Sequence, residues 1–306
     1  MNLVANNQTK LYGLESFFNE LKNLYDKDKL PNKILLSGLK GIGKCTLAYH
    51  LINYVLSIDE ENSYNFEGYT INSENRSYKL LQNHTNPNFY LVDVSFDKKS
   101  IDIEQIRNLI NNLNKSSFNS KPRFVLIDNI EFLNLNSINA LLKILEEPNP
   151  NINFILIHNN KKIIPTLLSR CLNFKIFLDS EKIEKINKNL FDQDIINLVN
   201  KDLINYYSTP GKLFEIINLS NEIKIDLINI NLKELLFLLI DESHYKKNNQ
   251  IKNLLYELIE FFLLKEISIK YSDLSSYFLN KMNDCKKFNL DDESLFLEIK
   301  SKVLNG

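Results

Sequence analysis

A glycine-rich turn between an apolar run and a helical run restricts the fold of this 306-residue chain more than any other feature. Residues 33–46 read KILLSGLKGIGKCT. Seven of the eight positions fit the phosphate-loop pattern GxxxxGK[ST] in its usual place between a strand and a helix. Glycines let backbone amides turn toward phosphate oxygens, and the helix start and a lysine add positive potential. The segment therefore predicts a P-loop fold with phosphate-binding residues Gly38, Gly41, Gly43 and Lys44.

The last position of the pattern is altered. P-loop enzymes hold magnesium there with a Ser or Thr hydroxyl, whereas this chain has Cys45. A thiol is a poor ligand for a hard, oxygen-preferring ion. Thr46 is adjacent, but its side chain would leave the helix in another direction. We expect the loop to be empty or to bind ATP or ADP without efficient hydrolysis, and the alternative is a glycine-rich turn that only joins strand and helix.

A second motif, the acidic end of an apolar run, also departs from the pattern that ATP hydrolysis requires. Residues 124–131 read FVLIDNIE, an apolar strand that ends in Asp128, which would help to hold magnesium. ATPases with this layout follow that Asp with a Glu that activates water, but here the position is Asn129. An amide cannot act as a general base. Glu131 is near but at the wrong offset, and Asp128 could also simply cap the next element.

Five short apolar runs alternate with helical patterns in the first part of the chain, at residues 33–37, 89–94, 124–128, 154–158 and 174–177. This order predicts a parallel sheet covered by helices on both faces. Pro148 and Pro150 would end the helix before the fourth run. After about residue 179 the pattern is helical. We predict an α/β domain over 1–178, a small helical lid over 179–220 and an all-α domain over 221–306.

Composition excludes several classes of protein. The net charge of −1 means that contact with nucleic acid would need a local basic face. Three separated cysteines without a CxxC pair argue against a zinc site or disulfides, so no metal is expected. The first residues lack an apolar signal core, and no run approaches the ~20 apolar residues that span a bilayer. We expect a cytoplasmic protein without membrane contact. Its basic pairs, predicted to be solvated or to meet DNA phosphates, are Lys98-Lys99, Lys161-Lys162, Lys246-Lys247 and Lys286-Lys287.

Two further motifs carry a family resemblance. Residues 134–148 read NLNSINALLKILEEP, and residues 165–171 read PTLLSRC. With the phosphate loop and the STPGK segment at 208–212, they resemble bacterial DNA polymerase III clamp-loader subunits of the AAA+ superfamily, over roughly residues 3–215. Motor subunits of that family have a complete P-loop, an Asp-Glu pair and usually four zinc-binding cysteines. This chain lacks all three features and is similar to the delta-prime type.

The resemblance implies a function and a set of partners. Delta-prime subunits close one end of a heteropentamer with delta and gamma/tau subunits, which loads the sliding clamp on primer-template DNA during replication. Their own ATP site is often degenerate, so no turnover by the chain alone is implied within the DNA polymerase III holoenzyme. The Ser-Arg-Cys arginine, Arg170 here, would complete a neighbour's ATP site in trans, where its planar fork suits phosphate. The alternative for Arg170 is a local salt bridge.

Other residues carry weaker expectations. Lys212 stands where the family has its sensor-2 basic residue, so it either contacts a phosphate or is solvated at a helix start. His158 lies near the sensor-1 position, and we expect a structural histidine. Cys171 is expected to be a packed small residue.

Two other functions remain open. The chain could be an active AAA+ ATPase of the gamma/tau kind, with Thr46 or a water replacing the hydroxyl and Glu131 acting as base. It could also be a P-loop nucleotide-binding module outside replication.

Overall fold

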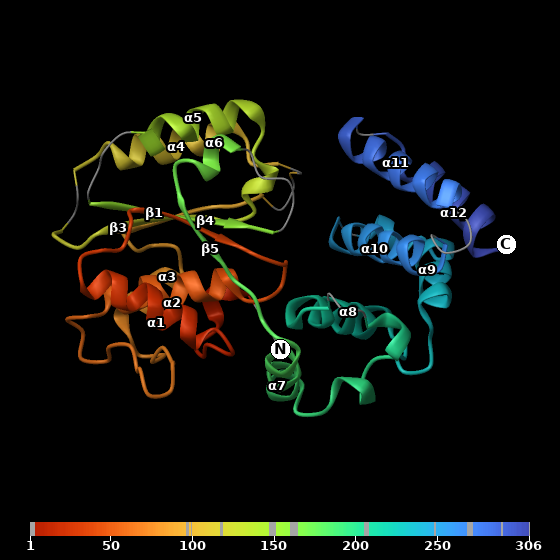
Figure 1. Ribbon diagram of the computed structural model, residues 1–306, viewed down its shortest axis with the longest axis horizontal. Coiled ribbons are helices and arrows are strands. Elements are labelled where there is room, and N and C mark those ends of the chain that lie inside the picture. The colour runs from red at the N-terminus through yellow and green to blue at the C-terminus, as the bar shows by residue number, and fades with distance from the viewer. Residues whose placement is uncertain are drawn as a thin grey trace. The chain divides into compact units, whose positions relative to one another are not determined.

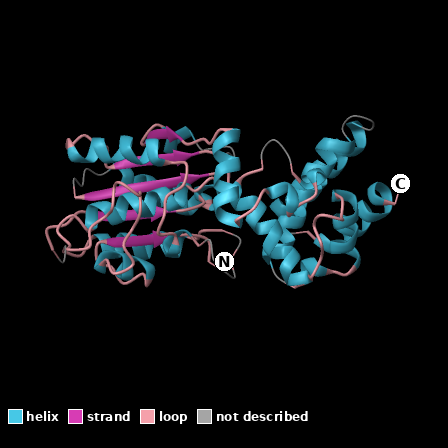
Figure 2. Ribbon diagram, turned by 90° about the horizontal axis from the view of Figure 1, so that it is seen from below, coloured by secondary structure: helices cyan, strands magenta, loops and turns pink. Residues whose placement is uncertain are grey.

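The computed structural model describes residues 4–95, 98, 100–116, 119–146, 151–159, 165–204, 208–247, 249–267, 272–288 and 290–305. The chain forms two compact units. Unit 1 comprises Met1–Ile186 and Thr209–Gly211, and unit 2 comprises Asn187–Ser208 and Lys212–Gly306. The strands all belong to unit 1, whereas helices and loops make up the described part of unit 2 (Figure 2). The finer division at 178 and 220 stays a prediction.

A single parallel sheet organises unit 1. Its strands follow the order β2-β3-β4-β1-β5 (Figure 1). They are β1 (Lys33–Ser37), β2 (Phe89–Val92), β3 (Arg123–Ile127), β4 (Ile152–His158) and β5 (Leu172–Lys175). The predicted five-stranded α/β fold of the AAA+ type is therefore confirmed. β1 lies between β4 and β5, and the phosphate loop that follows its last residue starts at the carboxyl edge of the sheet, where α/β proteins bind their ligands.

The fifth strand differs from its predicted position at residues 174–177. It begins at Leu172, which pairs with Ile34 of β1. Its apolar residues do not mark its bounds, because β5 is an edge strand: Leu172 inside it is 51% exposed, and Phe177 beyond it is 67% exposed. Apolar content predicts a strand well only where both of its faces are buried.

Alternating side chains of the inner strands build two cores. In β1, Ile34 and Leu36 belong to the core on one face of the sheet, and Leu35 belongs to the core on the other. In β3, Phe124 and Val125 divide in the same way. This period-two alternation with both faces buried is what a sheet covered by helices on each side requires.

The helices of unit 1 cover both faces of the sheet, with α1, α2 and α3 on one side and α4, α5 and α6 on the other (Figure 1). A capping box between Asp102 and Gln105 starts α4. The last described residue of α5 is Glu146, and Pro148 and Pro150, predicted to end this helix, lie outside the described residues. The bounds are α1 Glu15–Asp26, α2 Lys44–Leu56, α3 Arg76–Gln82, α4 Ile103–Leu113, α5 Leu135–Glu146 and α6 Pro165–Leu168. The next helix, α7 Ser180–Phe191, begins in unit 1 and ends in unit 2.

Unit 2 is built from helices around a core of its own. Leu235, Leu236 and Leu239 are fully buried there together with Leu255 and Ile259, as their helical spacing predicts. Within the described residues, no helix combines the length and the apolar character needed to cross a membrane. The main helices are α8 Pro210–Ile223, which starts in Thr209–Gly211 of unit 1, then α9 Leu232–Asp241, α10 Asn249–Phe262, α11 Ser272–Phe288 and α12 Asp292–Ile299.

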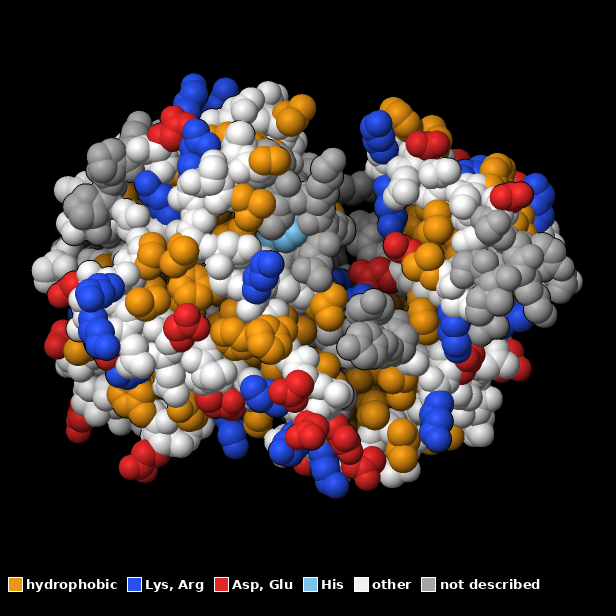
Figure 3. Space-filling view, in the orientation of Figure 1, with side chains coloured by type: hydrophobic (Ala, Val, Ile, Leu, Met, Phe, Trp, Pro, Cys, Tyr) orange, Lys and Arg blue, Asp and Glu red, His pale blue; other side chains and the backbone are white. Residues whose placement is uncertain are grey.

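Basic side chains are dispersed. On the face drawn in Figure 3, described Lys and Arg side chains lie among acidic and apolar ones. Lys98 forms an ion pair with Asp102, and the Lys246 ammonium lies 2.7 Å from Glu293. These contacts fit solvated, locally paired lysines. Of the other members of the predicted basic pairs, Lys99, Lys161 and Lys162 lie outside the described residues.

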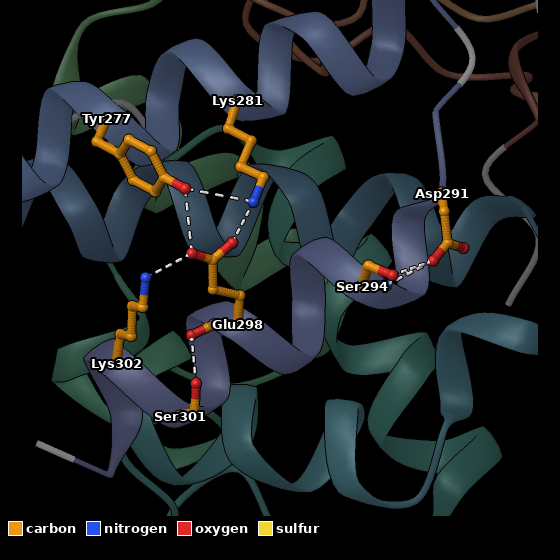
Figure 4. Close-up of polar contacts among 7 residues, drawn as sticks. All are labelled: Tyr277, Lys281, Asp291, Ser294, Glu298, Ser301 and Lys302. Carbon is orange, nitrogen blue, oxygen red and sulfur yellow. Dashed lines mark hydrogen bonds and ion pairs between the residues drawn. The ribbon is translucent and has the colours of Figure 1, made fainter.

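A charged cluster on Glu298 joins α11 to the end of the chain (Figure 4). The Glu298 carboxylate accepts hydrogen bonds from Lys281, from the Tyr277 hydroxyl at 3.1 Å and from Lys302 at 2.7 Å. The hydrogen bond from Lys281, followed by that from Lys302, lowers the pKa of Glu298 to about 2 from its usual 4.5. The ionised form of Glu298 therefore stabilises this end of unit 2.

We predict that Glu298→Gln destabilises the chain at pH 7 and has less effect in acid. The folded pKa lies below the unfolded one, so the stabilisation is complete above pH 4.5 and is lost as the pH falls through about 2. Because the cluster is at the surface, the loss at pH 7 should be no more than about 1 kcal/mol. Urea unfolding of both proteins at pH 7 and pH 3.5 measures it. An equal loss at both values would contradict the assignment.

Candidate functional site

The phosphate loop has the backbone geometry that its glycines predict. β1 passes into Gly38, and α2 begins at Lys44. Gly41 and Gly43 have φ values of 83° and 93°, in the left-handed region that residues with a Cβ rarely adopt. Gly43 is the N-cap of α2 and makes no side-chain cap, so the first amides of this 13-residue helix can serve an anion. These residues fit the phosphates of a nucleotide.

Lys44 is buried within this loop, with 3% of its surface exposed. Its ammonium donates to the carbonyl of Gly38 at 3.0 Å and to that of Leu39 at 2.5 Å. Burial lowers the pKa of Lys44 to about 8, although the negative charges of Asp128 and Glu131 oppose this shift. The lysine is thus held inside the loop and remains mostly protonated at neutral pH, as a phosphate ligand must be.

Asp128 lies directly after β3, beside the start of α2. Burial raises its pKa to about 6, and the nearby charge of Asp93 acts in the same direction. The Cys45 thiol and the Asn129 amide donate hydrogen bonds to this carboxyl group and partly offset the shift. The structure therefore brings Cys45 and Asp128 into contact, where a P-loop enzyme would place its two magnesium-binding groups.

These two groups do not fit magnesium. Burial, followed by the charge of Asp128, raises the pKa of Cys45 well above its usual range, so the thiol stays protonated. A neutral thiol offers no oxygen to a hard cation. Thr46, the next residue on α2, is half-buried. Among the described residues, no group of three or more His, Cys, Asp or Glu side chains could hold a metal ion.

A polar network at the ends of three neighbouring strands holds Asn129. Asn129, with a left-handed φ of 56°, donates from its side-chain amide to Asp93 at 2.9 Å. Its side-chain oxygen accepts from the Asn159 amide at 2.8 Å, and Asn159 also donates to Glu131 at 3.0 Å. Both ends of the Asn129 side chain are therefore bound by protein groups, and Glu131 is engaged by Asn159.

Sequence reasoning missed Asp93 and Asn159. Each follows a strand directly, Asp93 after β2 and Asn159 after β4. Polar residues just after parallel strands gather at one edge of the sheet, and this signal could have found them. The prediction put His158 near this position. His158, expected to be structural, is the last residue of β4 and is 2% exposed, and the neighbouring Asn159 makes the contacts with the acidic motif.

The segment Thr209–Gly211 touches the phosphate loop from outside. The Thr209 hydroxyl donates to the carbonyl of Lys40 at 2.7 Å, and the Gly211 amide donates to that of Gly41 at 2.9 Å. A Cβ at Gly211 would come within 2.7 Å of the Gly41 Cα, so a glycine is needed at this close approach. The next residue, Lys212, belongs to unit 2 and lies 3.4 Å from the Glu257 carboxylate. Its predicted contact with a phosphate stays a prediction.

Arg170 lies elsewhere in unit 1, two residues beyond the end of α6 at Leu168. Its side chain is 30% exposed and forms an ion pair with Glu146 at the end of α5. One guanidinium nitrogen, Nη1, also donates to the Thr166 carbonyl at 2.9 Å. The local salt bridge considered for Arg170 is therefore present, and an exposed part of the side chain remains. Next to it, burial raises the pKa of Cys171 to about 11, which fits an unreactive, packed thiol.

Comparisons with known proteins agree with these motifs. The family model described as "DNA polymerase III, delta subunit" matches residues 13–179. DNA polymerase III subunit gamma of Buchnera aphidicola subsp. Schizaphis graminum is 30% identical over 234 residues, which cover 73% of this chain and 60% of that protein. DNA polymerase III subunit delta' of Pseudomonas aeruginosa is 31% identical over 139 residues, 45% of this chain and 40% of that protein.

A solved DNA polymerase III gamma subunit-related protein from Thermotoga maritima has 16% sequence identity and a TM-score of 0.46, with 94% of this chain and 97% of that chain covered. The chain spans only about 40 to 60% of the length of the two curated relatives, the Buchnera gamma subunit and the Pseudomonas delta' subunit. The family model, by contrast, covers more than half of the chain, including the phosphate loop, Asp128 and the Ser-Arg-Cys segment. This chain belongs to the DNA polymerase III delta subunit family, a group of AAA+ clamp-loader subunits.

Proposed function

We propose that this chain is a delta-prime-type, non-motor subunit of a DNA polymerase III clamp loader. One observation carries the proposal: the protonated Cys45 thiol lies beside the Asp128 carboxyl group where magnesium would be bound. Because a protonated thiol offers no oxygen ligand, this pair binds magnesium poorly. The loop would then hold the phosphates of ATP or ADP with little metal and without efficient hydrolysis.

The Asn129 network supports the same proposal from the side of water activation. A general base must accept a proton from water, which an amide cannot do. Glu131 could accept a proton, but its two oxygens receive the side-chain and backbone amides of Asn159 at 3.0 and 3.4 Å. These two hydrogen bonds hold Glu131 against Asn159, at an offset from the usual position of the base. Water activation would therefore be weakened independently of magnesium binding.

In the proposed assembly, the chain joins delta and gamma/tau subunits in a heteropentamer and works on DNA in the cytoplasm. The AAA+ domain (1–178) and the lid (179–220) would keep the family's arrangement, and the helices of residues 221–306 would form its part of the collar. Arg170 would face a neighbour's nucleotide and stabilise charge on the transferred phosphoryl group. The complex would load the sliding clamp on primer-template DNA.

A change at Cys45 tests the inert-site proposal. We expect the wild-type chain to bind ATP with nearly equal affinity in magnesium and in EDTA. Cys45→Ser restores a hydroxyl ligand, so its ATP affinity should become magnesium-dependent, by a factor on the order of 10. Isothermal titration of the isolated chain measures both values. Cys171→Ser, which changes another partly buried thiol, should behave like the wild type.

The gamma relative favours a second candidate, an active motor subunit that hydrolyses ATP itself. That candidate predicts tight magnesium-dependent ATP binding by the wild-type chain. It also predicts turnover by the purified chain that Lys44→Ala abolishes. Either result would displace the non-motor proposal.

A further inference from the structure

The Arg170 guanidinium is held from two directions. Its Nε donates to the Glu146 Oε1 at 3.0 Å, and its Nη2 donates to the same oxygen. On the other side, its Nη1 donates to the Thr166 carbonyl at 2.9 Å. Glu146 is the last described residue of α5, whereas Thr166 belongs to α6. Two elements that are distant in sequence therefore fix the plane of one side chain.

This arrangement leaves part of the fork able to meet another group. Nη2 carries two N–H groups, and the planar geometry directs one of them away when the other meets Glu146. The side chain is 30% exposed, so part of it is open to solvent. An arginine held in this way loses less rotamer freedom when it meets a phosphate than one that moves freely in solvent.

The ion pair between Arg170 and Glu146 contributes little to the stability of the fold. The Glu146 side chain is 56% exposed, and exposed ion pairs contribute only about 0 to 1 kcal/mol. Its removal should leave the fold intact. Its effect on the direction of the guanidinium is larger, because a displacement of about 1 Å at a reacting group can cost as much as 100-fold in rate.

We propose that Glu146 is a positioning residue for Arg170, which orients the guanidinium toward a phosphate held by a neighbouring subunit. This inference rests on the proposed function, in which Arg170 acts in trans. Glu146 acts through the arginine and touches no nucleotide. The maximal rate should then depend on Glu146, whereas the affinity for ATP, set by the neighbour's own loop, should not.

The test measures ATP hydrolysis by a loader assembled from this chain with motor and delta subunits, in the presence of clamp and primer-template DNA. Glu146→Ala should lower kcat by about tenfold and leave KM for ATP unchanged. Glu146→Gln keeps an oxygen acceptor at the same place, so its kcat should fall between the two. Glu20→Ala, which removes an exposed carboxylate on α1, is the matched control and should match the wild type.

A double-mutant cycle separates positioning from a general structural effect. In the Arg170→Ala background, Glu146→Ala should cause no further loss, because there is no guanidinium left to orient. An added loss there, or an unchanged or raised kcat in the single variant, overturns the positioning role. If Arg170→Ala itself has no effect, the proposed function fails instead, so the two failures are distinguishable.

Discussion

Replacing Arg170 with alanine is expected to abolish most of the ATP turnover at the site that this arginine is proposed to complete in an assembled loader. The expected loss there is on the order of 10³-fold, the lower end of what arginine fingers contribute in nucleotide hydrolases. The physical reason is the loss of a fixed positive fork beside phosphoryl oxygens that gain charge in the transition state. Steady-state ATP hydrolysis and clamp loading by the reconstituted complex measure the effect.

Two controls make this result specific. Arg170→Lys keeps the charge but loses the planar fork, so it should recover only a small part of the rate. Arg76→Ala removes an exposed arginine from α3 and should leave the rate at the wild-type value. All variants should assemble equally, because the ion pair with Glu146 is exposed and adds little stability. Normal hydrolysis and clamp loading by Arg170→Ala would remove the finger assignment.

Gly38→Ala is expected to cause the largest loss of stability among single changes near the site. A Cβ there would lie 2.3 Å from the Ile176 carbonyl oxygen and 2.9 Å from the Ile42 Cδ1. The first of these atoms is backbone, which follows β5 and cannot rotate away. The φ of 157° adds strain for a residue with a side chain. Overpacking and backbone strain together should cost about 3 to 5 kcal/mol.

Hydrogen exchange in increasing urea, read from peptides of β1 and β5, measures the unfolding of unit 1 by itself. The Gly38→Ala variant should lose protection at a much lower urea concentration than the wild type. Gly68→Ala is the matched control, since its Cβ would meet the rotatable Thr70 side chain at 3.3 Å, and it should change stability by less than about 0.5 kcal/mol. Equal protection in the wild type and Gly38→Ala would contradict the close approach to β5.

The fold and the phosphate loop could be predicted because their signals are local. The alternation of apolar runs and helical patterns predicts the sheet, and the glycines with Lys44 predict the turn. The predicted position of the edge strand β5 was wrong because Leu172 and Phe177 are both largely exposed, so apolar content does not mark where this strand lies.

The polar contacts around the site could not be predicted in the same way. Asp93, Asn129 and Asn159 meet only because parallel strands place their ends at one edge of the sheet. Glu146 and Arg170 are 24 residues apart, and no periodicity relates them. Such contacts depend on tertiary packing, and they carry the information on whether the site can act.

The central claim is that this chain contributes an arginine to another subunit's ATP and does not depend on its own phosphate loop for turnover. The most direct measurement compares Lys44→Ala and Arg170→Ala in the same reconstituted loader, with ATP hydrolysis and clamp loading as readouts and equal assembly as a condition. We predict near wild-type activity for Lys44→Ala and a severe loss for Arg170→Ala. Loss of activity in Lys44→Ala with normal activity in Arg170→Ala would contradict the account.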